Sequence, residues 1–482
     1  MPIVTLPITN GFYVSNSLPI SAQECTNWYT VVESAPSLAP ETLRGTPGIE
    51  QVETSGTILQ SNRGAHTMAG VPYFVNGTKL YQLDQTQVIP TEVYDLVELG
   101  TVAGTARCSM ADNGTQMLVL VPGGNGYIYN HVTDTFTQIT DLDFTANGNP
   151  QFVVFIDGYF VVTTDTKKFI VSAINDGLSW NALDYGTAES DPDNIVAPIV
   201  FKNQLFISGS QTFEAFQNIG GSDFPFQRSG LFLDKGVFSP YSLINTQDTF
   251  MWVGGGQNES PSIWAFAGNS TQKISTVAID FILKTLTNDQ LANVYSWTYS
   301  QNGSYFVAFA LPNSTLVYDH ASKRWHERKS YIEGEQVGYR VSGLTQAYNH
   351  IFCGDLIDGR IGKLNPDLFT EYTGNIIRTV ATQPFQNNTQ SMFVPSIELT
   401  VESGVGNAES VNPLIAMDRS VDGKTWSDQR TRELGRIGQY NRRAIWRRNG
   451  RASRFEVFRF TLSDPVKPVI IQLNADILPG TK

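Results

Sequence analysis

The sequence predicts an all-β protein in three parts. These are an extended N-terminal arm over residues 1–50, a six- or seven-bladed β-propeller over 51–375, and a β-sandwich-like domain over 376–482. The composition predicts the all-β class, because 41 Gly, 28 Phe and 19 Tyr favour strands and tight turns. A repeat of about 47 residues and a change of charge near residue 375 predict the division into parts.

The first 50 residues carry no repeat and hold six prolines, four of them between Pro19 and Pro47. We expect an arm that wraps over the body or reaches a neighbouring subunit. The first basic residue is Arg44, so no positively charged segment precedes an apolar one, and we expect no secretory signal. No apolar run reaches the ~18 residues of a membrane span.

Residues 51–375 read as short strands separated by turn signals. Two-residue turns need a positive φ, which Asn and Gly tolerate, and such turns join antiparallel strands. Examples of Asn-Gly, Asp-Gly and Gly-Gly pairs are at 76–77, 113–114, 123–124, 157–158, 176–177, 254–255 and 302–303. The sequence therefore predicts consecutive β-hairpins.

A repeat underlies these hairpins. Two strands, a Tyr and an apolar residue seven positions later recur at Tyr81, Tyr129 and Tyr318. Fainter copies fall at 159–180, 204–216, 250–266 and 351–364. This period and content are typical of propeller blades. The alternative is a meandering β-sandwich whose spacing is accidental.

One stretch within the repeat is helical in pattern. Residues 276–294 place apolar side chains at helical spacing, and Thr287 with Gln290 forms a capping box. We expect a short helical pair inserted between two blades.

The C-terminal part is basic. Residues 376–482 hold 15 Lys and Arg against 10 Asp and Glu, whereas the first 375 residues hold 18 against 35. Arginines cluster around an aromatic residue, and this pattern suits a protein interface, a solvated face or stacked nucleotides. We favour an interface with a neighbouring subunit or adaptor, and its candidate residues are Arg442, Arg443, Trp446, Arg447, Arg448 and Arg451.

Several stretches, in order along the chain, resemble one family. They are residues 43–49 (LRGTPGI), 179–185 (SWNALDY), 206–214 (FISGSQTFE), 224–228 (FPFQR) and 443–451 (RAIWRRNGR). The family is that of the packaged-DNA stabilisation proteins, also called tail accessory, tail hub or nozzle proteins, of short-tailed bacteriophages.

The resemblance implies a structural virion protein of the tail, assembled in the cytoplasm of the bacterial host. It implies a homo-oligomeric ring of six copies below the portal and its adaptor protein. Such a ring retains packaged DNA, serves as the ejection conduit and carries tail spikes or fibres, with a tail needle or plug as a further partner. The acidic propeller would then present a negative wall along which double-stranded DNA slides without sequence-specific binding.

We expect no enzymatic activity, no cofactor and no metal. His326 and Glu327 are adjacent, so in a strand they point to opposite faces and do not share a site. The acidic loop with Asp184, Glu189, Asp191 and Asp193 lacks the spacing of a calcium loop. The runner-up function is a glycan-binding or glycan-cleaving propeller, which needs two carboxyl groups in a pocket with aromatic walls.

Overall fold

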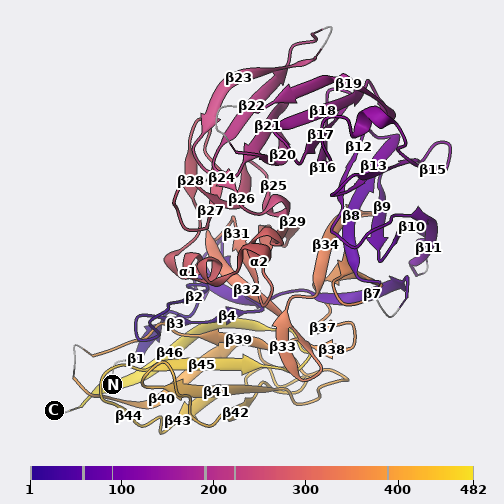
Figure 1. Cartoon of the computed structure of the whole chain (residues 1–482). Helices are drawn as coiled ribbons and strands as arrows, with labels where there is room; N and C mark the ends of the chain where they lie inside the picture. The colour runs from indigo at the N-terminus through magenta and orange to yellow at the C-terminus, as the bar shows by residue number, and fades with distance from the viewer. Residues whose placement is uncertain are drawn as a thin grey trace.

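The protein is a ring of β-sheets joined to a layered β domain (Figure 1). The structure, a computed structural model, describes residues 3–56, 60–89, 91–188, 193–221, 224–387 and 390–480. Both termini lie at the same end of the layered domain, away from the ring (Figure 1). The two domains are a β-propeller and a β-sandwich.

The first four blades are consecutive four-stranded antiparallel meanders. They are β8–β11 (Asn62–Met68, Val71–Asn76, Lys79–Gln87, Val93–Thr101), β12–β15 (Ser109–Asp112, Gln116–Val121, Asn125–Asn130, Thr135–Gln138), β16–β19 (Pro150–Ile156, Tyr159–Thr164, Lys168–Ala173, Asp176–Thr187) and β20–β23 (Ile195–Phe201, Gln204–Gly209, Phe213–Asn218, Phe226–Leu233). The 3-10 helix η1 (Leu142–Phe144) lies between the second and third blades.

Three further blades complete the ring. The fifth is β24–β28 (Gly236–Val237, Ile244–Asn245, Phe250–Gly255, Ser262–Phe266, Thr271–Lys273) with η2 (Pro240–Ser242), and the sixth is β29–β32 (Tyr295–Gln301, Ser304–Ala310, Thr315–Asp319, Arg324–Ile332). The seventh combines β34–β36 (Val341–Ala347, His350–Asp355, Arg360–Asn365) with β7 (Gly48–Thr54). Because β7 precedes the first blade in sequence, its pairing with β36 joins the two ends of the propeller.

Apolar cores fill the spaces between adjacent blades, and each inner strand contacts the next around the ring. Between the first two blades, the rings of Tyr73 and Tyr129 lie 5.6 Å apart. Between the fourth and fifth, Phe213 packs edge-to-face on Trp252. Aromatic pairs of this kind suit the flat faces of stacked sheets. The repeat seen in the sequence is therefore the repeat of these inter-blade layers.

Most predicted turns join strands as expected, and two do not. Asp157 and Gly158 both have positive φ, as a two-residue hairpin turn requires. The pair at 254–255 instead lies inside β26, and a Cβ on Gly254 would meet the carbonyl oxygen of Gly236 at 1.8 Å. Close approach of two backbones explains that glycine. The pair at 176–177 begins β19, and the turn before that strand lies two residues earlier, at 174–175.

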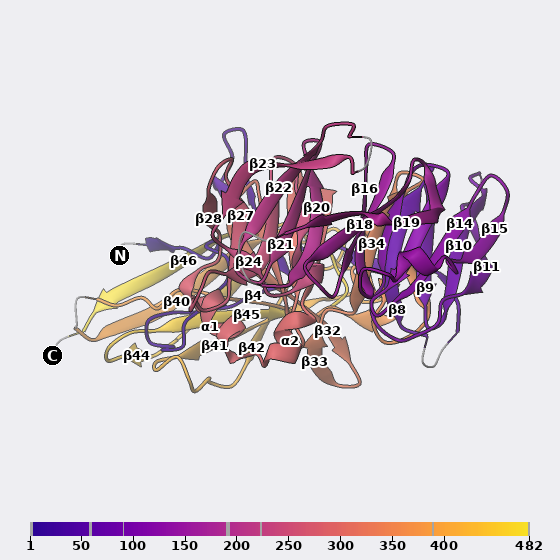
Figure 2. The same ribbon diagram turned by 45° about the horizontal axis from the view of Figure 1, so that its top comes forward.

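The predicted helical pair is present between the fifth and sixth blades. Helix α1 (Val277–Thr285) begins after Thr276, and α2 (Asn288–Ala292) begins after Thr287 with the predicted capping box to Gln290. In the turned view both helices lie where the propeller meets the sandwich (Figure 2).

The C-terminal domain is a sandwich of two sheets. One sheet has the order β43-β40-β46-β6-β5, with β1 on β46 and β44 on β40, and the other continues from β32 of the propeller as β4-β39-β45-β41-β42. Their bounds are β1 (Ile3–Leu6), β4 (Cys25–Thr26), β5 (Trp28–Val32), β6 (Glu41–Gly45), β39 (Arg378–Ala381), β40 (Met392–Val401), β41 (Leu414–Ser420), β42 (Arg430–Glu433), β43 (Ala444–Arg447), β44 (Arg451–Ala452), β45 (Val457–Leu462) and β46 (Val469–Pro479).

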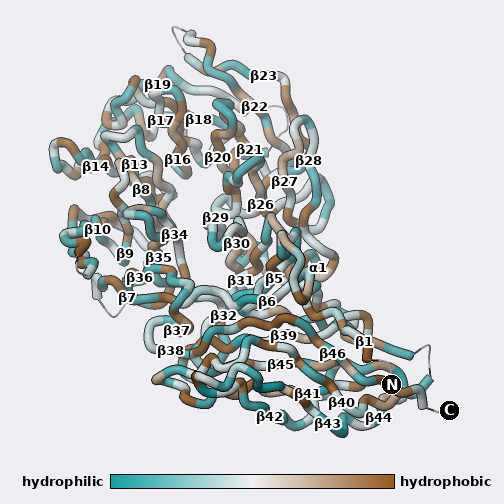
Figure 3. The backbone as a smooth tube through the Cα atoms, turned by 180° about the vertical axis from the view of Figure 1, so that it is seen from behind, coloured by the Kyte–Doolittle hydropathy of each residue, from teal (hydrophilic) through white to brown (hydrophobic). Residues whose placement is uncertain are grey.

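Short strands complete the junction between the domains. These are β2 (Tyr13–Val14), β3 (Ala22–Gln23), β33 (Glu335–Gly338), β37 (Thr370–Glu371) and β38 (Gly374–Asn375). The sandwich strands carry apolar segments (Figure 3), and the core of the sandwich includes Val380 of β39 and Ile470, Leu473 and Ala475 of β46.

The N-terminal residues differ from the expected arm. Strands β1, β5 and β6 belong to the sandwich, β4 joins the propeller to the sandwich, and β7 belongs to the seventh blade. Asn27 occupies the junction with φ of 59°. Its side-chain nitrogen donates to the carbonyls of Lys329, at 2.9 Å, and Ile377, at 2.8 Å, and its side-chain oxygen accepts from the Lys329 amide at 3.1 Å. One buried side chain thus connects blade six to the sandwich.

Glu371 gives the junction a predictable pH dependence. Burial raises the pKa of Glu371 from 4.5 to about 7, and this effect outweighs the neighbouring arginines. The folded protein therefore holds this proton more tightly than the unfolded chain, so the stabilisation is complete below pH ~4.5 and is lost as the pH rises through ~7. Urea unfolding between pH 4.5 and 8 measures how the free energy of unfolding changes with pH. We expect this change to be smaller in Glu371→Gln than in the wild type, by up to about 3 kcal/mol. A wild-type-minus-variant difference that is constant with pH would contradict the assignment.

Candidate interaction surfaces

Side chains from five blades meet at the axis of the propeller. Arg107, just before β12, donates to the carbonyl oxygen of Ser342 on β34 at 2.8 Å and to its hydroxyl at 2.9 Å. The same guanidinium lies 3.6 Å from the ring centroid of Tyr295 on β29. The Tyr241 hydroxyl in the fifth blade donates to the Arg107 carbonyl, and the Tyr241 ring packs on Phe152 of β16 at 5.1 Å. These contacts bridge the axis.

This axis differs from the negative wall expected from the sequence. Among the described residues, the inner strands β8, β12, β16, β20, β25, β29 and β34 contain a single acidic residue, Asp112. Asp112 is paired with His66 at 2.7 Å. A DNA duplex, whose major groove alone is about 12 Å wide, does not fit through an axis bridged by side chains. The acidic residues of the propeller lie mainly on its other strands and loops.

The arginine-rich segment forms one edge of the sandwich, on the side away from the propeller (Figure 1). Two of its arginines are structural. Arg432 donates to the carbonyl of Ile445 at 2.6 Å, and Arg430 donates to the carbonyl of Arg447 at 3.1 Å. β43 pairs with β40 along one edge. The two guanidinium groups donate hydrogen bonds to carbonyls along its other edge. Covering an edge strand in this way blocks uncontrolled strand pairing.

Three candidate residues point outward from the edge strands. Arg447 is opposite Ser396, and Arg451 is opposite Phe393, whose ring it approaches at 6.0 Å. Arg443 forms a two-bond pair with Glu398 at 2.7 and 2.5 Å. In the described part of the chain, Arg447 and Arg451 have no carboxylate partner. We call Arg443, Arg447 and Arg451 the arginine face.

The other candidate residues are placed differently. Arg442 pairs with Glu433 on the opposite sheet, and Arg448 is exposed at a positive φ of 59°. Trp446 is 0% exposed and its indole nitrogen donates to the carbonyl of Arg430 at 2.6 Å. Trp446 therefore offers no exposed surface to a partner in this structure. In an alternating strand the residue between two outward side chains faces the core.

Sequence reasoning missed two exposed apolar residues in the loop that precedes Arg443. Ile437 and Tyr440 lie in the loop between β42 and β43 and are 73% and 68% exposed. Gly435, before Ile437, and Gly438, between Ile437 and Tyr440, have positive φ, as a projecting loop requires. The spacing of these two glycines was the sequence signal from which a projecting loop could have been predicted. Exposed Tyr beside Arg is the composition of interface hot spots.

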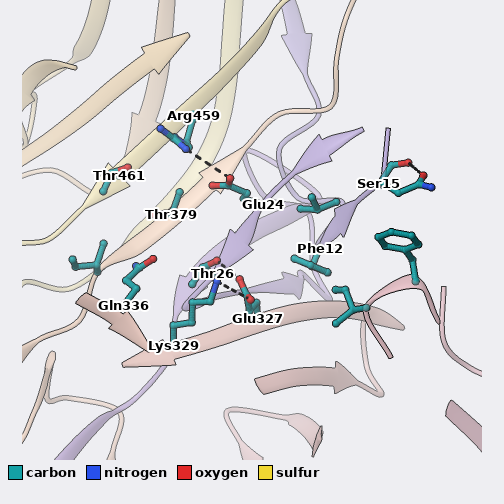
Figure 4. A pocket seen from close by; sticks show the side chains of 15 residues that line it. Phe12, Ser15, Glu24, Thr26, Glu327, Lys329, Gln336, Thr379, Arg459 and Thr461 are labelled. Carbon is teal, nitrogen blue, oxygen red and sulfur yellow. Dashed lines mark hydrogen bonds and ion pairs between the residues drawn. The ribbon is translucent and has the colours of Figure 1, made fainter. Parts of the chain in front are cut away.

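A cavity of about 580 Å³ lies where the propeller, the N-terminal segment and the sandwich meet (Figure 4). Its floor is a row of side chains in register across four strands, Glu327, Thr26, Thr379 and Thr461. Phe12 and, on helix α1, Phe281 contribute apolar walls.

The cavity contains the two carboxyl groups that a glycan-cleaving site would need, Glu24 and Glu327. Both are engaged: Glu327 accepts from Thr26 at 2.9 Å and pairs with Lys329 at 3.0 Å, and Glu24 lies 3.7 Å from Arg459. Burial raises the pKa of Glu24. The Thr26–Glu327 contact joins β4 to β32, and the Glu24–Arg459 pair joins the residue before β4 to β45, so the geometry gives the two glutamates a structural role.

The remaining sequence candidates are structural. His326 is 2% exposed, whereas Glu327 lines the cavity, so the two point to opposite faces as predicted. Cys25, Cys108 and Cys353 are free and buried. Asp193 accepts from Ser210 at 3.1 Å, whereas Glu189 and Asp191 of the acidic loop lie outside the described residues.

Metal and membrane features are absent from the part of the chain that the structure describes. No group of three or more His, Cys, Asp or Glu side chains there is arranged to hold a metal ion. Within the same residues, no helix has the length and apolar character to span a membrane.

These features define a class of protein: a propeller joined to a sandwich through its N-terminal strands, with exposed contact surfaces. The family model described as the bacteriophage P22 Gp10 β-propeller matches residues 4–369, and the P22 Gp10 β-sandwich model matches residues 377–478. The chain belongs to the bacteriophage P22 Gp10 family. It is 25% identical over 438 residues to the tail hub protein gp10 of Salmonella phage P22, covering 86% of this chain and 87% of that protein. It is therefore a homologue of a phage tail structural protein.

Two solved structures are similar to this chain over about two thirds of its length. The N-terminal domain of Nup159 matches with a TM-score of 0.40 and 11% identity, over 69% of this chain and 97% of that domain. The WD40 β-propeller domain of Doa1 matches with a TM-score of 0.40 and 10% identity, over 66% of this chain and 97% of that domain.

Proposed function

We propose that this chain is a non-enzymatic hub subunit of a short-tailed phage tail, located in the virion. The observation that carries the proposal is the match of both domains to one tail hub family, over residues 4–369 and 377–478. The engaged carboxylates of the interdomain cavity support a structural role over the glycan-cleaving alternative.

The conduit for DNA would be formed between copies of the chain. The axis of each propeller is bridged by Arg107 and Tyr241, so a single copy offers no passage for a duplex. A closed ring of six copies below the portal and adaptor supplies a passage on its own symmetry axis. The same ring carries the tail spikes or fibres and meets the needle or plug.

The arginine face would bind an acidic surface of a neighbouring copy or of the portal adaptor. Guanidinium groups pair bidentately with carboxylates, and Arg447 and Arg451 are unpaired within the described residues. Ile437 and Tyr440, in the loop that leads into Arg443, add exposed apolar area to this edge of the sandwich. The excess of acidic residues in the first 375 residues makes another copy electrostatically complementary.

Reversing two charges on the arginine face tests this interface. We expect Arg447→Glu with Arg451→Glu to leave the thermal midpoint within about 2 °C, because both side chains are exposed. Assembly should weaken at least about a hundredfold, because like charges then face each other across the contact. Sedimentation of the chain, alone and with the portal–adaptor complex, measures the loss.

The matched control is the reversal of two exposed lysines on the propeller and helix α1, Lys202→Glu and Lys284→Glu. This double variant changes the net charge by the same amount as the reversal on the arginine face, and it should assemble as the wild type does. Equal weakening by both pairs would assign the effect to net charge and not to the arginine face.

A further inference from the structure

Two arginines close to the propeller axis have no acidic partner among the described residues. Arg107 hydrogen-bonds only uncharged groups, the carbonyl and hydroxyl of Ser342, and stacks on Tyr295. Arg63 is 5% exposed and donates to the carbonyls of Ala106, at 2.7 Å, and Gly77, at 2.8 Å. One terminal nitrogen of Arg63 has no hydrogen-bond partner. A charge withdrawn from water is costly unless it is paired, and the half-buried guanidinium of Arg107 lines a cavity, so it calls for an anion.

The backbone carrying Arg107 is held on both sides. The Cys108 amide donates to the Arg63 carbonyl at 2.8 Å, and the Tyr241 hydroxyl donates to the carbonyl of Arg107 itself. The Ser296 hydroxyl in turn donates to the carbonyl of Tyr241 at 3.2 Å. The guanidinium is therefore fixed in place, and a fixed donor binds a ligand with little further loss of conformational entropy.

A cavity is available next to this guanidinium. It has a volume of about 270 Å³, and Arg107, Met110, Tyr241, Tyr295 and Leu344 are among the residues that line it. None of the residues that line it is acidic. Burial also lowers the pKa of Arg107, which is the effect of a low-dielectric site without a counter-charge.

We propose that the axial cavity of the propeller binds a compact oxyanion, such as inorganic phosphate, with Arg107 as its principal ligand. The bound anion would neutralise the guanidinium while Ser342 and Tyr295 keep it oriented. Because Arg107, Ser342 and Tyr295 belong to three blades, the anion would also stabilise the closed ring of blades. This site is separate from the arginine face and does not depend on the proposed tail function.

Isothermal titration of the full chain with inorganic phosphate in a sodium chloride buffer tests binding directly. Thermal unfolding at constant ionic strength tests its consequence. At a phosphate concentration tenfold above the dissociation constant, we expect the midpoint of the wild type to rise by about 2 °C. Arg107→Met should fold in chloride, because it removes a half-buried charge that has no carboxylate partner, and should show no phosphate-dependent rise.

Arg454→Met removes an exposed arginine of the sandwich and is the matched control, which should respond to phosphate as the wild type does. Arg107→Lys keeps the charge without the planar fork and should bind phosphate at least about tenfold more weakly. If Arg107→Met does not fold, the wild-type titration and Arg107→Lys decide the question. Absence of phosphate binding by the wild type, or equal binding by the Arg107 and Arg454 variants, would overturn the proposal.

Discussion

Replacing Asn27 with alanine is expected to lower the free energy of unfolding by about 4 kcal/mol. Asn27 is 1% exposed, and its side chain makes three hydrogen bonds to the backbones of Lys329 and Ile377. Alanine would leave those partly buried backbone groups without partners, and it also disfavours the φ of 59°. Because these bonds connect blade six to the sandwich, we expect the single urea transition to separate into two.

The matched control is Asn203→Ala. Asn203 has the same φ of 59° but is exposed in a hairpin turn, so only the backbone penalty of about 1 kcal/mol remains. Asn27→Gly keeps the backbone freedom and loses the hydrogen bonds, and it should resemble Asn27→Ala. Equal losses for Asn27→Ala and Asn203→Ala would show that the hydrogen bonds at the junction contribute nothing.

Replacing Arg340 with methionine is expected to lower the free energy of unfolding by about 4 kcal/mol. Arg340 pairs with Asp355 at 2.6 Å in the seventh blade, and the two side chains are 8% and 0% exposed. The same guanidinium lies 4.6 Å from the ring centroid of Tyr372. Methionine fills similar space but leaves the Asp355 carboxylate buried without its counter-charge. Urea unfolding of the full chain measures the loss.

Two further variants separate charge from packing at this site. Arg340→Met combined with Asp355→Leu should recover most of the lost stability, since removing both charges removes the uncompensated one. Arg360→Met breaks the more exposed pair with Asp358 and should cost no more than about 1 kcal/mol. A double variant as unstable as Arg340→Met would mean that packing on Tyr372, and not the ion pair, carries the effect.

The propeller and sandwich could be predicted because their signals are local. The Tyr-centred repeat and the Asn-Gly turns depend on neighbours within one hairpin, and the structure places Tyr81, Tyr129 and Tyr318 in equivalent strands of three blades. The role of the first 50 residues could not be predicted because their strands pair with residues hundreds of positions away. Thr26, for example, lies between Glu327 and Thr379.

The candidate site was predictable only in part. An arginine-rich segment on an edge strand was visible in the sequence, but alternation along β43 turns Trp446 inward and Arg447 outward. Arg430 and Arg432 bind backbone carbonyls that exist only once the sandwich has formed. Arg107 lay in an unremarkable segment, and its meeting with Ser342 and Tyr295 follows from closure of the ring of blades.

Imaging of the chain bound to the portal–adaptor complex, with the copy number determined by light scattering, tests whether the protein is a tail hub. We expect a ring docked below the portal, with one channel on the ring axis and every propeller axis off that channel. A stable monomer that does not bind the complex would contradict the tail hub assignment. A DNA path running through the propeller axis, past Arg107, would contradict the proposed conduit.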